Sequence, residues 1–138
     1  MSSRNLVELH RLQAERLSPR IALRFKRHGL YHDLPWSQYR ADAFACAAAL
    51  ADVGVQPGDR VGLFAENRVE WLLADIGVLT AGAVNVTPHA PLTARQVQYE
   101  LADSGASWLF VSTREQLARS NRSAPNCPRS AASSPSTR

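Results

Sequence analysis

The spacing of apolar side chains predicts a helix followed by a β-hairpin at the start of the chain. Leucine recurs at helical spacing over residues 5–17, and the Ser18-Pro19 pair should end this helix, because proline disfavours helical geometry in the residue before it. Apolar and polar residues then alternate over residues 21–34 on either side of Gly29. That pattern is typical of two short antiparallel strands joined by a tight turn.

A second helix is predicted between Trp36 and Gly54. Apolar residues step by three and four positions along this segment and so form one stripe on a helical surface. The stripe should be buried, which places Cys46 in the core, and Gly54 is a typical helix-ending glycine. The members of the stripe are Trp36, Tyr39, Ala43, Cys46, Leu50 and Val53.

Residues 60–112 alternate between short apolar runs and amphipathic segments. The run VGLFA at 61–65 is continuously apolar and too short for a helix, so it predicts a central parallel strand covered on both faces. A largely buried helix should follow the N-cap Asn67. A further helix, capped by Thr93 and running to Ala102, should separate the strand AVNV from the strand SWLFVS. Because strands that alternate with helices imply right-handed parallel crossovers, the predicted fold class is α/β: an N-terminal helix, a β-hairpin and a partial parallel sheet with flanking helices.

The composition changes abruptly after Arg119. The last nineteen residues contain six serines and three prolines but no Leu, Ile, Val, Phe, Tyr or Trp, so they cannot bury enough apolar surface to offset the entropy of ordering. We expect residues 1–119 to form the folded domain and residues 120–138 to be a disordered tail. Its richness in Arg, Ser, Pro and Ala favours a frameshifted or non-native ending, and a genuine disordered linker is the alternative.

The net charge of +4 does not indicate an anionic partner once it is located along the chain. Three arginines lie in the predicted tail, and the preceding residues carry 13 basic against 12 acidic side chains. No basic patch with interleaved aromatic residues is visible, so we expect no nucleic-acid partner. The two cysteines, Cys46 and Cys127, indicate neither a disulfide framework nor a metal cluster and fit a reducing, cytoplasmic location. No secretory signal or transmembrane segment is predicted.

The sequence motifs give little support for a phosphate-binding, metal-binding or catalytic site formed by this chain alone. The glycines match neither of the two phosphate-binding patterns that place backbone N–H groups at a helix start. His28 and His32 flank the hairpin glycine, but they lack the further ligands that a zinc site needs and are more simply exposed polar residues. Glu66 and Glu70 surround a predicted helix start, where helix-dipole electrostatics and neutralisation by Arg68 explain them without paired-carboxylate catalysis.

The segment ENRVEWLLADIGVLTAGAVNV, residues 66–86, carries a specific resemblance. It resembles the Glu-Asn-Arg-x-Glu-Trp run, the small-residue helix ending in Ala-Gly-Ala and the Val-rich strand of the AMP-forming acyl-CoA synthetases, which are adenylate-forming ligases. The flanking segments GVQPGDRVGLF and LTARQVQYELADSGASWLFVS are similar to the same family, and the similarity extends over about residues 5–119. The resemblance implies that residues 1–119 are part of the N-terminal, AMP-binding domain of such a ligase. It also implies a parent reaction that joins a fatty acid or another carboxylic acid to AMP and then to the thiol of CoA.

The resemblance also implies that one loop lies near the substrate. In complete enzymes of this family the loop after the Val-rich strand commonly lies near the acyl and adenylate pocket, which makes His89 a candidate substrate-side residue. The chain departs from the family here, because Thr87 stands where the family usually has proline and Pro88 follows. A solvated loop histidine is the alternative interpretation of His89.

The ATP-binding and catalytic motifs of the family are not found in these 138 residues. Family members hold the ATP phosphates with a Ser/Thr/Gly-rich loop ending in lysine and use a mobile C-terminal lysine to polarise the carboxylate. Lys26 is the only lysine and belongs to the predicted hairpin, where a solvated strand residue is the simpler interpretation. We therefore expect no catalytic, cofactor-binding or metal-binding residue here, although the parent family uses ATP, Mg²⁺ and CoA.

Two functional hypotheses remain open on the sequence. The first is a fragment of an AMP-dependent acyl-CoA synthetase that is inactive alone. The second is a non-catalytic interaction module that associates through an exposed sheet edge. Because a fragment would lack the neighbouring strands that later sequence supplies, we expect self-association or aggregation through uncovered sheet surface.

Overall fold

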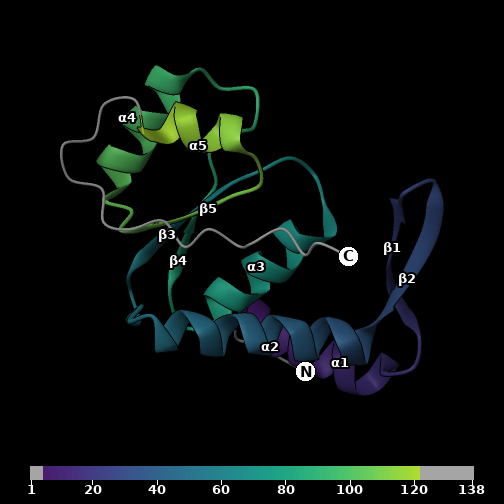
Figure 1. Ribbon diagram of the computed structural model, residues 1–138. Coiled ribbons are helices and arrows are strands. Elements are labelled where there is room, and N and C mark those ends of the chain that lie inside the picture. The colour runs from purple at the N-terminus through teal and green to yellow at the C-terminus, as the bar shows by residue number, and fades with distance from the viewer. Residues whose placement is uncertain (1–4, 122–138) are drawn as a thin grey trace. The chain divides into compact units, whose positions relative to one another are not determined.

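The computed structural model describes residues 5–121, which divide into two compact units (Figure 1). The first unit contains the described residues up to Pro57 together with Asn67–Ala83. The second contains Gly58–Glu66 and the described residues from Val84 onward. The predicted tail lies outside the described residues from position 122.

The first unit consists of three helices and a two-stranded antiparallel hairpin. The hairpin turns at His28 and Gly29, which have φ angles of 50° and 81°, and it pairs Phe25 with His32. Because positive φ favours glycine, the predicted role of Gly29 is confirmed. The elements are α1 (Leu6–Leu17), β1 (Ile21–Arg27), β2 (Leu30–Pro35), α2 (Trp36–Asp52) and α3 (Val69–Thr80).

The core of the first unit forms where α2 packs against α1 and α3. Tyr39 and Ala43 of α2 are buried together with Ile76 of α3. The Tyr39 hydroxyl donates a hydrogen bond to the carbonyl of Leu72 over 3.2 Å. Burial, with a smaller contribution from the nearby Asp75 carboxylate, raises the pKa of Tyr39 to about 12, so its hydroxyl stays a donor at neutral pH.

Two details of this unit differ from the prediction. Val53 was placed on the buried stripe but is 49% exposed, because α2 ends at Asp52 and Val53 is the residue that caps it. The N-cap of α3 is Arg68 and not Asn67, and no side chain caps the helix there. Glu70 in the first turn places a negative charge near the positive end of the helix dipole instead.

The helices α2 and α3 approach most closely at a glycine. A Cβ atom on Gly77 would lie 2.7 Å from both Cβ and Sγ of Cys46 and 3.2 Å from the carbonyl oxygen of Ala43. Cys46 therefore lies against α3, half-buried, on the face where the apolar stripe placed it.

The second unit is a parallel sheet with two helices. The strand order is β4-β3-β5, which confirms β3 as the central strand, and Val61, Leu63 and Phe64 of β3 are at most 1% exposed. Thr93 caps α4 as predicted and forms a reciprocal capping box with Gln96. The elements are β3 (Arg60–Phe64), β4 (Val84–Val86), α4 (Ala94–Ser104), β5 (Trp108–Val111) and α5 (Arg114–Asn121).

Apolar periodicity did not reveal α5. The side chains that this helix buries most deeply are polar, since Gln116 is 0% and Ser120 is 7% exposed. The helix runs to Asn121, so the first two residues of the predicted tail are helical.

The first unit buries a histidine, His10, whose burial the sequence pattern did not indicate. His10 of α1 is 8% exposed, and its ring centroid lies 4.6 Å from that of Tyr39 and 5.6 Å from that of Trp36. Its Nε2 atom has no hydrogen-bond partner within the described part of the chain. Burial, assisted by the positive charge of Arg40, lowers the pKa of His10 below its usual value of 6.5.

We predict that Gly77→Ala destabilises the protein by about 1–3 kcal/mol, because the added methyl overpacks the contact with Cys46. Chemical denaturation of the variant and the parent chain measures the difference. Replacing glycine by alanine inside a helix otherwise stabilises by about 0.5–1 kcal/mol, so an increase in stability would show that the α2 and α3 contact is not close.

We predict that the first unit loses stability as the pH falls below 6.5. The unfolded chain then takes up a proton on His10 that the folded chain resists, so protonation favours unfolding. Urea unfolding at pH 7.5 and pH 5.5 measures the loss, and His10→Phe should reduce it. His28→Asn is the control, because His28 is exposed and asparagine tolerates its positive φ. An equal loss in the His10→Phe variant would contradict the assignment.

Candidate functional site

The carboxyl ends of the three parallel strands form the candidate site. Ligands of open α/β sheets bind beyond this edge. In the second unit, β3 leads to Glu66, β5 leads to Ser112, and β4 leads to the loop 87–93 that contains His89. Polar side chains from α5 contact the chain at all three of these strand ends.

Gln116 joins the ends of β3 and β5. Its Nε2 donates to Oε1 of Glu66 over 2.9 Å, and its Oε1 accepts from the backbone N–H of Ser112 over 3.0 Å. The Ser112 hydroxyl lies 2.5 Å from Oε2 of Glu66 and 2.7 Å from Oε1 of Gln116, and its single proton can be donated to one of them at a time. The fully buried Gln116 amide is therefore satisfied at both its oxygen and its nitrogen, as a buried polar group requires.

Arg119, one turn further along α5, binds the loop after β4. Its Nη1 donates to the carbonyl oxygens of Ala90 and Leu92 over 3.0 and 3.2 Å. Its guanidinium carbon lies 5.4 Å from the centroid of the Phe64 ring, and Nη2 lies 3.4 Å from Glu115. The helix thus fixes the ends of all three strands through two side chains.

A short sequence signal could have revealed this helix. Thr113-Arg114-Glu115-Gln116 matches the S/T-x-x-E/Q pattern of a helix start. The Thr113 hydroxyl oxygen accepts from the backbone N–H of Gln116 over 3.1 Å, as that pattern requires. The Gln116 side chain, however, turns toward Glu66 and Ser112.

His89 lies in the loop that Arg119 contacts, and its side chain is exposed. The carbonyl oxygen of His89 accepts a hydrogen bond from the backbone N–H of Leu92 over 3.0 Å, which forms a turn. His89 thus lies in an exposed turn of the loop, and its role on the substrate side stays a prediction.

The other residues weighed in the sequence have structural partners. Glu66 and Glu70 belong to different units, and Glu70 binds Arg68 and Arg27 in the first unit. The hydrogen bond from Arg68 lowers the pKa of Glu70, which agrees with the neutralisation expected from the sequence. Lys26 lies over the Tyr31 ring, 5.8 Å from its centroid.

The two hairpin histidines join no metal cluster among the described residues. The His32 ring stacks on Phe25, with 5.6 Å between centroids. Within residues 5–121, no three His, Cys, Asp or Glu side chains are grouped closely enough to hold a metal ion.

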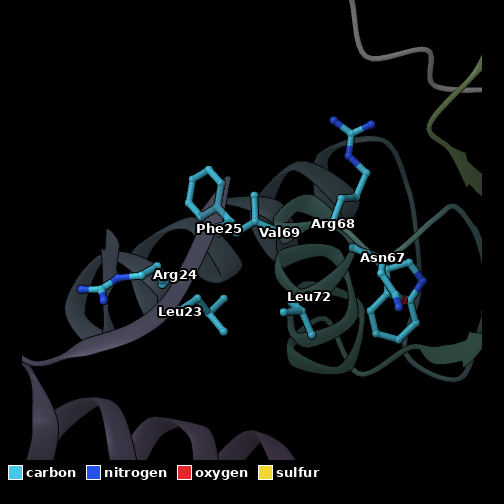
Figure 2. A pocket seen from close by; sticks show the side chains of 8 residues that line it. Leu23, Arg24, Phe25, Asn67, Arg68, Val69 and Leu72 are labelled. Atoms are coloured by element: carbon cyan, nitrogen blue, oxygen red, sulfur yellow. The ribbon is translucent and has the colours of Figure 1, made fainter. Parts of the chain in front are cut away.

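A cavity of about 340 Å³ lies in the first unit between β1 and the start of α3 (Figure 2). Leu23 and Leu72 face each other across it, whereas the guanidinium groups of Arg24 and Arg68 point away. Both arginines are paired with acids, Arg24 with Asp33 and Arg68 with Glu70. The cavity brings no reactive pair together, so we place the candidate site at the strand ends.

Comparison with protein families identifies the class of this chain. Residues 11–136 match the family described as AMP-binding enzyme. The chain belongs to this family, as the pattern in residues 66–86 indicated. The matched range runs beyond Arg119, and the frameshifted or native origin of the tail stays a prediction.

Several curated relatives are named as ligases of long-chain fatty acids. The chain is 38% identical over 85 residues to the long-chain-fatty-acid–CoA ligase FadD15 of Mycobacterium tuberculosis, which covers 62% of this chain and 14% of the relative. It is 33% identical over 110 residues to the long-chain-fatty-acid–CoA ligase ACSBG2 of Mus musculus, which covers 80% of this chain and 16% of the relative. The chain therefore spans about one seventh of the length of these relatives.

Solved structures show the same fold. A fatty acyl-adenylate ligase from L. pneumophila, solved with acyl adenylate and pyrophosphate, aligns with a TM-score of 0.74 at 24% identity and covers 86% of this chain and 21% of that one. The N-terminal subdomain of NpsA from Klebsiella oxytoca aligns with a TM-score of 0.72 at 21% identity, over 78% of this chain and 26% of that one. The α/β fold predicted as part of a ligase N-terminal domain is confirmed. None of the helices between residues 5 and 121 has the length and apolar character needed to cross a bilayer.

We predict that Gln116→Ala destabilises the second unit by about 1–3 kcal/mol, because it leaves Glu66 and Ser112 without their shared partner. Glu115→Ala on the same helix is the matched control, since Glu115 is 80% exposed and its loss should change stability by less than about 0.5 kcal/mol. Denaturation followed by fluorescence of Trp108 in β5, with Trp36 and Trp71 of the first unit replaced by phenylalanine in every variant, measures both. Equal stability of the two variants would contradict the network.

Proposed function

We propose that this chain supplies the N-terminal part of an acyl-CoA ligase that uses ATP to activate a long-chain fatty acid and then transfers the acyl group to CoA. The observation that carries the proposal is the ENRVEW to AGAVNV segment at 66–86, set within a family match over residues 11–136. The names of the relatives FadD15 and ACSBG2 support the long-chain fatty acid as the substrate class.

The described residues suit a supporting role near the substrate. The loop 87–93 leaves β4 at the carboxyl edge of the sheet, where ligands of α/β proteins bind, and two backbone carbonyls of this loop are held by Arg119. We infer that His89 faces the acyl group of the adenylate from this loop. We also place the protein in the cytoplasm, in keeping with the free thiol of Cys46.

The chain alone should not catalyse the reaction. Stabilising a transferring phosphoryl group requires cations held at its oxygens, and the 138 residues contain no Gly-rich phosphate loop ending in lysine. ATP, Mg²⁺ and CoA would then be bound by parts of the ligase that these residues do not supply.

A second candidate function is non-catalytic association. In the described sheet β4 and β5 each pair with β3 alone, so each has one edge without a strand partner, and Val84 on β4 is 48% exposed. Unpaired edges with apolar side chains promote strand addition, either by a partner or by a second copy of the chain.

A chimeric ligase tests the proposed role directly, and we predict that it keeps its activity. Residues 11–121 of this chain should replace the N-terminal segment of FadD15 that contains the 85 aligned residues and still permit formation of long-chain acyl-CoA from ATP, CoA and palmitate. The control chimera carries Gln116→Ala, which should lower activity through the loss of the strand-end network. A folded chimera that binds neither palmitate nor ATP would contradict the proposal.

The isolated 138-residue chain provides the complementary measurement. It should show no palmitate-dependent exchange of pyrophosphate into ATP above a mock preparation, while intact FadD15 does. Sedimentation of the same sample at micromolar concentration tests the self-association expected of a fragment, because association through the uncovered sheet gives oligomers. A compact, cooperatively unfolding monomer would indicate that the sheet is closed within these residues and would favour the interaction module.

A further inference from the structure

The loop after β4 has little means of holding its own shape. Residues 87–93 include Pro88 and Pro91, which have no backbone N–H to donate. One internal hydrogen bond, from the N–H of Leu92 to the carbonyl of His89, closes a turn over 3.0 Å. The loop is fixed where it enters α4 by the Thr93 capping box, but the segment before Thr93 needs partners from elsewhere.

Arg119 supplies those partners. A single guanidinium nitrogen, Nη1, donates to the carbonyls of both Ala90 and Leu92, which flank the second proline of the loop. The planar guanidinium carries five N–H donors in a rigid fork, so it can hold two carbonyls while its plane lies near an aromatic ring, here that of Phe64. The side chain is only 26% exposed, which protects these bonds from competition with water.

The position of Arg119 is itself fixed through α5. Gln116 lies three residues earlier on the same helical face and anchors the helix to Glu66 and to Ser112. The backbone carbonyl of Arg119 accepts a hydrogen bond from Nε2 of Gln98 in α4 over 3.1 Å. Movement of α5 would therefore displace the guanidinium and release the loop.

We propose that Arg119 is a positioning residue that fixes the conformation of the loop 87–92 and so sets where His89 stands. The benefit to substrate binding rests on the proposed ligase function, whereas the mechanical link between α5 and the loop does not. Docking of α5 and ordering of the loop are one coupled event, because the same side chain takes part in both.

Hydrogen exchange in the full 138-residue chain tests the link. In Arg119→Ala the Leu92 amide should exchange at least about tenfold faster, because the turn that protects it has lost its anchor, while the amides of β3 should change by much less. The ring resonances of His89 should shift in the same variant. Arg119→Lys, which keeps the charge and one donor group, should show a smaller acceleration at Leu92.

Glu115→Ala is the matched control, because it removes the ion pair with Arg119 and leaves both carbonyl bonds in place. It should leave the exchange of Leu92 and the His89 resonances unchanged. Uniform acceleration across the second unit in Arg119→Ala and Arg119→Lys would overturn the proposal by showing a purely structural role, and so would an unchanged Leu92 amide. Because no substrate is present, these outcomes are independent of whether the FadD15 chimera forms acyl-CoA.

Discussion

The second unit depends on the burial of β3 from Val61 to Phe64. This strand is paired along both edges and covered on both faces, so every neighbouring element must approach it closely. Gly62 makes that approach possible, because a Cβ atom there would lie 2.6 Å from Leu109 and 2.9 Å from Leu101. Burial of a strand on both faces needs a continuous apolar run, and this requirement explains why the strand was recognisable in the sequence.

Apolar spacing predicted elements that bury apolar side chains, but it did not predict α5, which buries polar ones. The periodicity of α2 and the short apolar run of β3 report directly which helical face and which strand leave water, whereas Leu6 and Leu9 of α1 stay exposed and that helix buries His10 and Ala14. The helix α5 buries Gln116, whose amide is stable in the interior only because Glu66 and Ser112 come from distant parts of the chain. That compensation is a property of the folded structure and leaves no apolar pattern in the sequence.

In the candidate site, likewise, one part was predicted from the sequence and another was not. The loop containing His89 was located through a resemblance to known ligases, which identifies a position but not what holds it. Arg119 stands three residues after Gln116 in a segment of low apolar content, where an arginine usually signifies a solvated surface. Only the folded chain brings its guanidinium to the carbonyls of Ala90 and Leu92.

Arginine side chains in the second unit hold backbone carbonyls in place, including those of the loop after β4. Arg60 donates to the carbonyls of Ser104 and Gly58, and Arg119 donates to two loop carbonyls, so both guanidinium groups organise backbone. A guanidinium whose N–H groups already bind backbone carbonyls is poorly placed to stabilise the negative charge that develops on a transferring phosphoryl group. Shaping the loop and stabilising the phosphates are thus separate tasks that demand different cations. The residues described between positions 5 and 121 carry out the first of these tasks through the link between α5 and the strand ends.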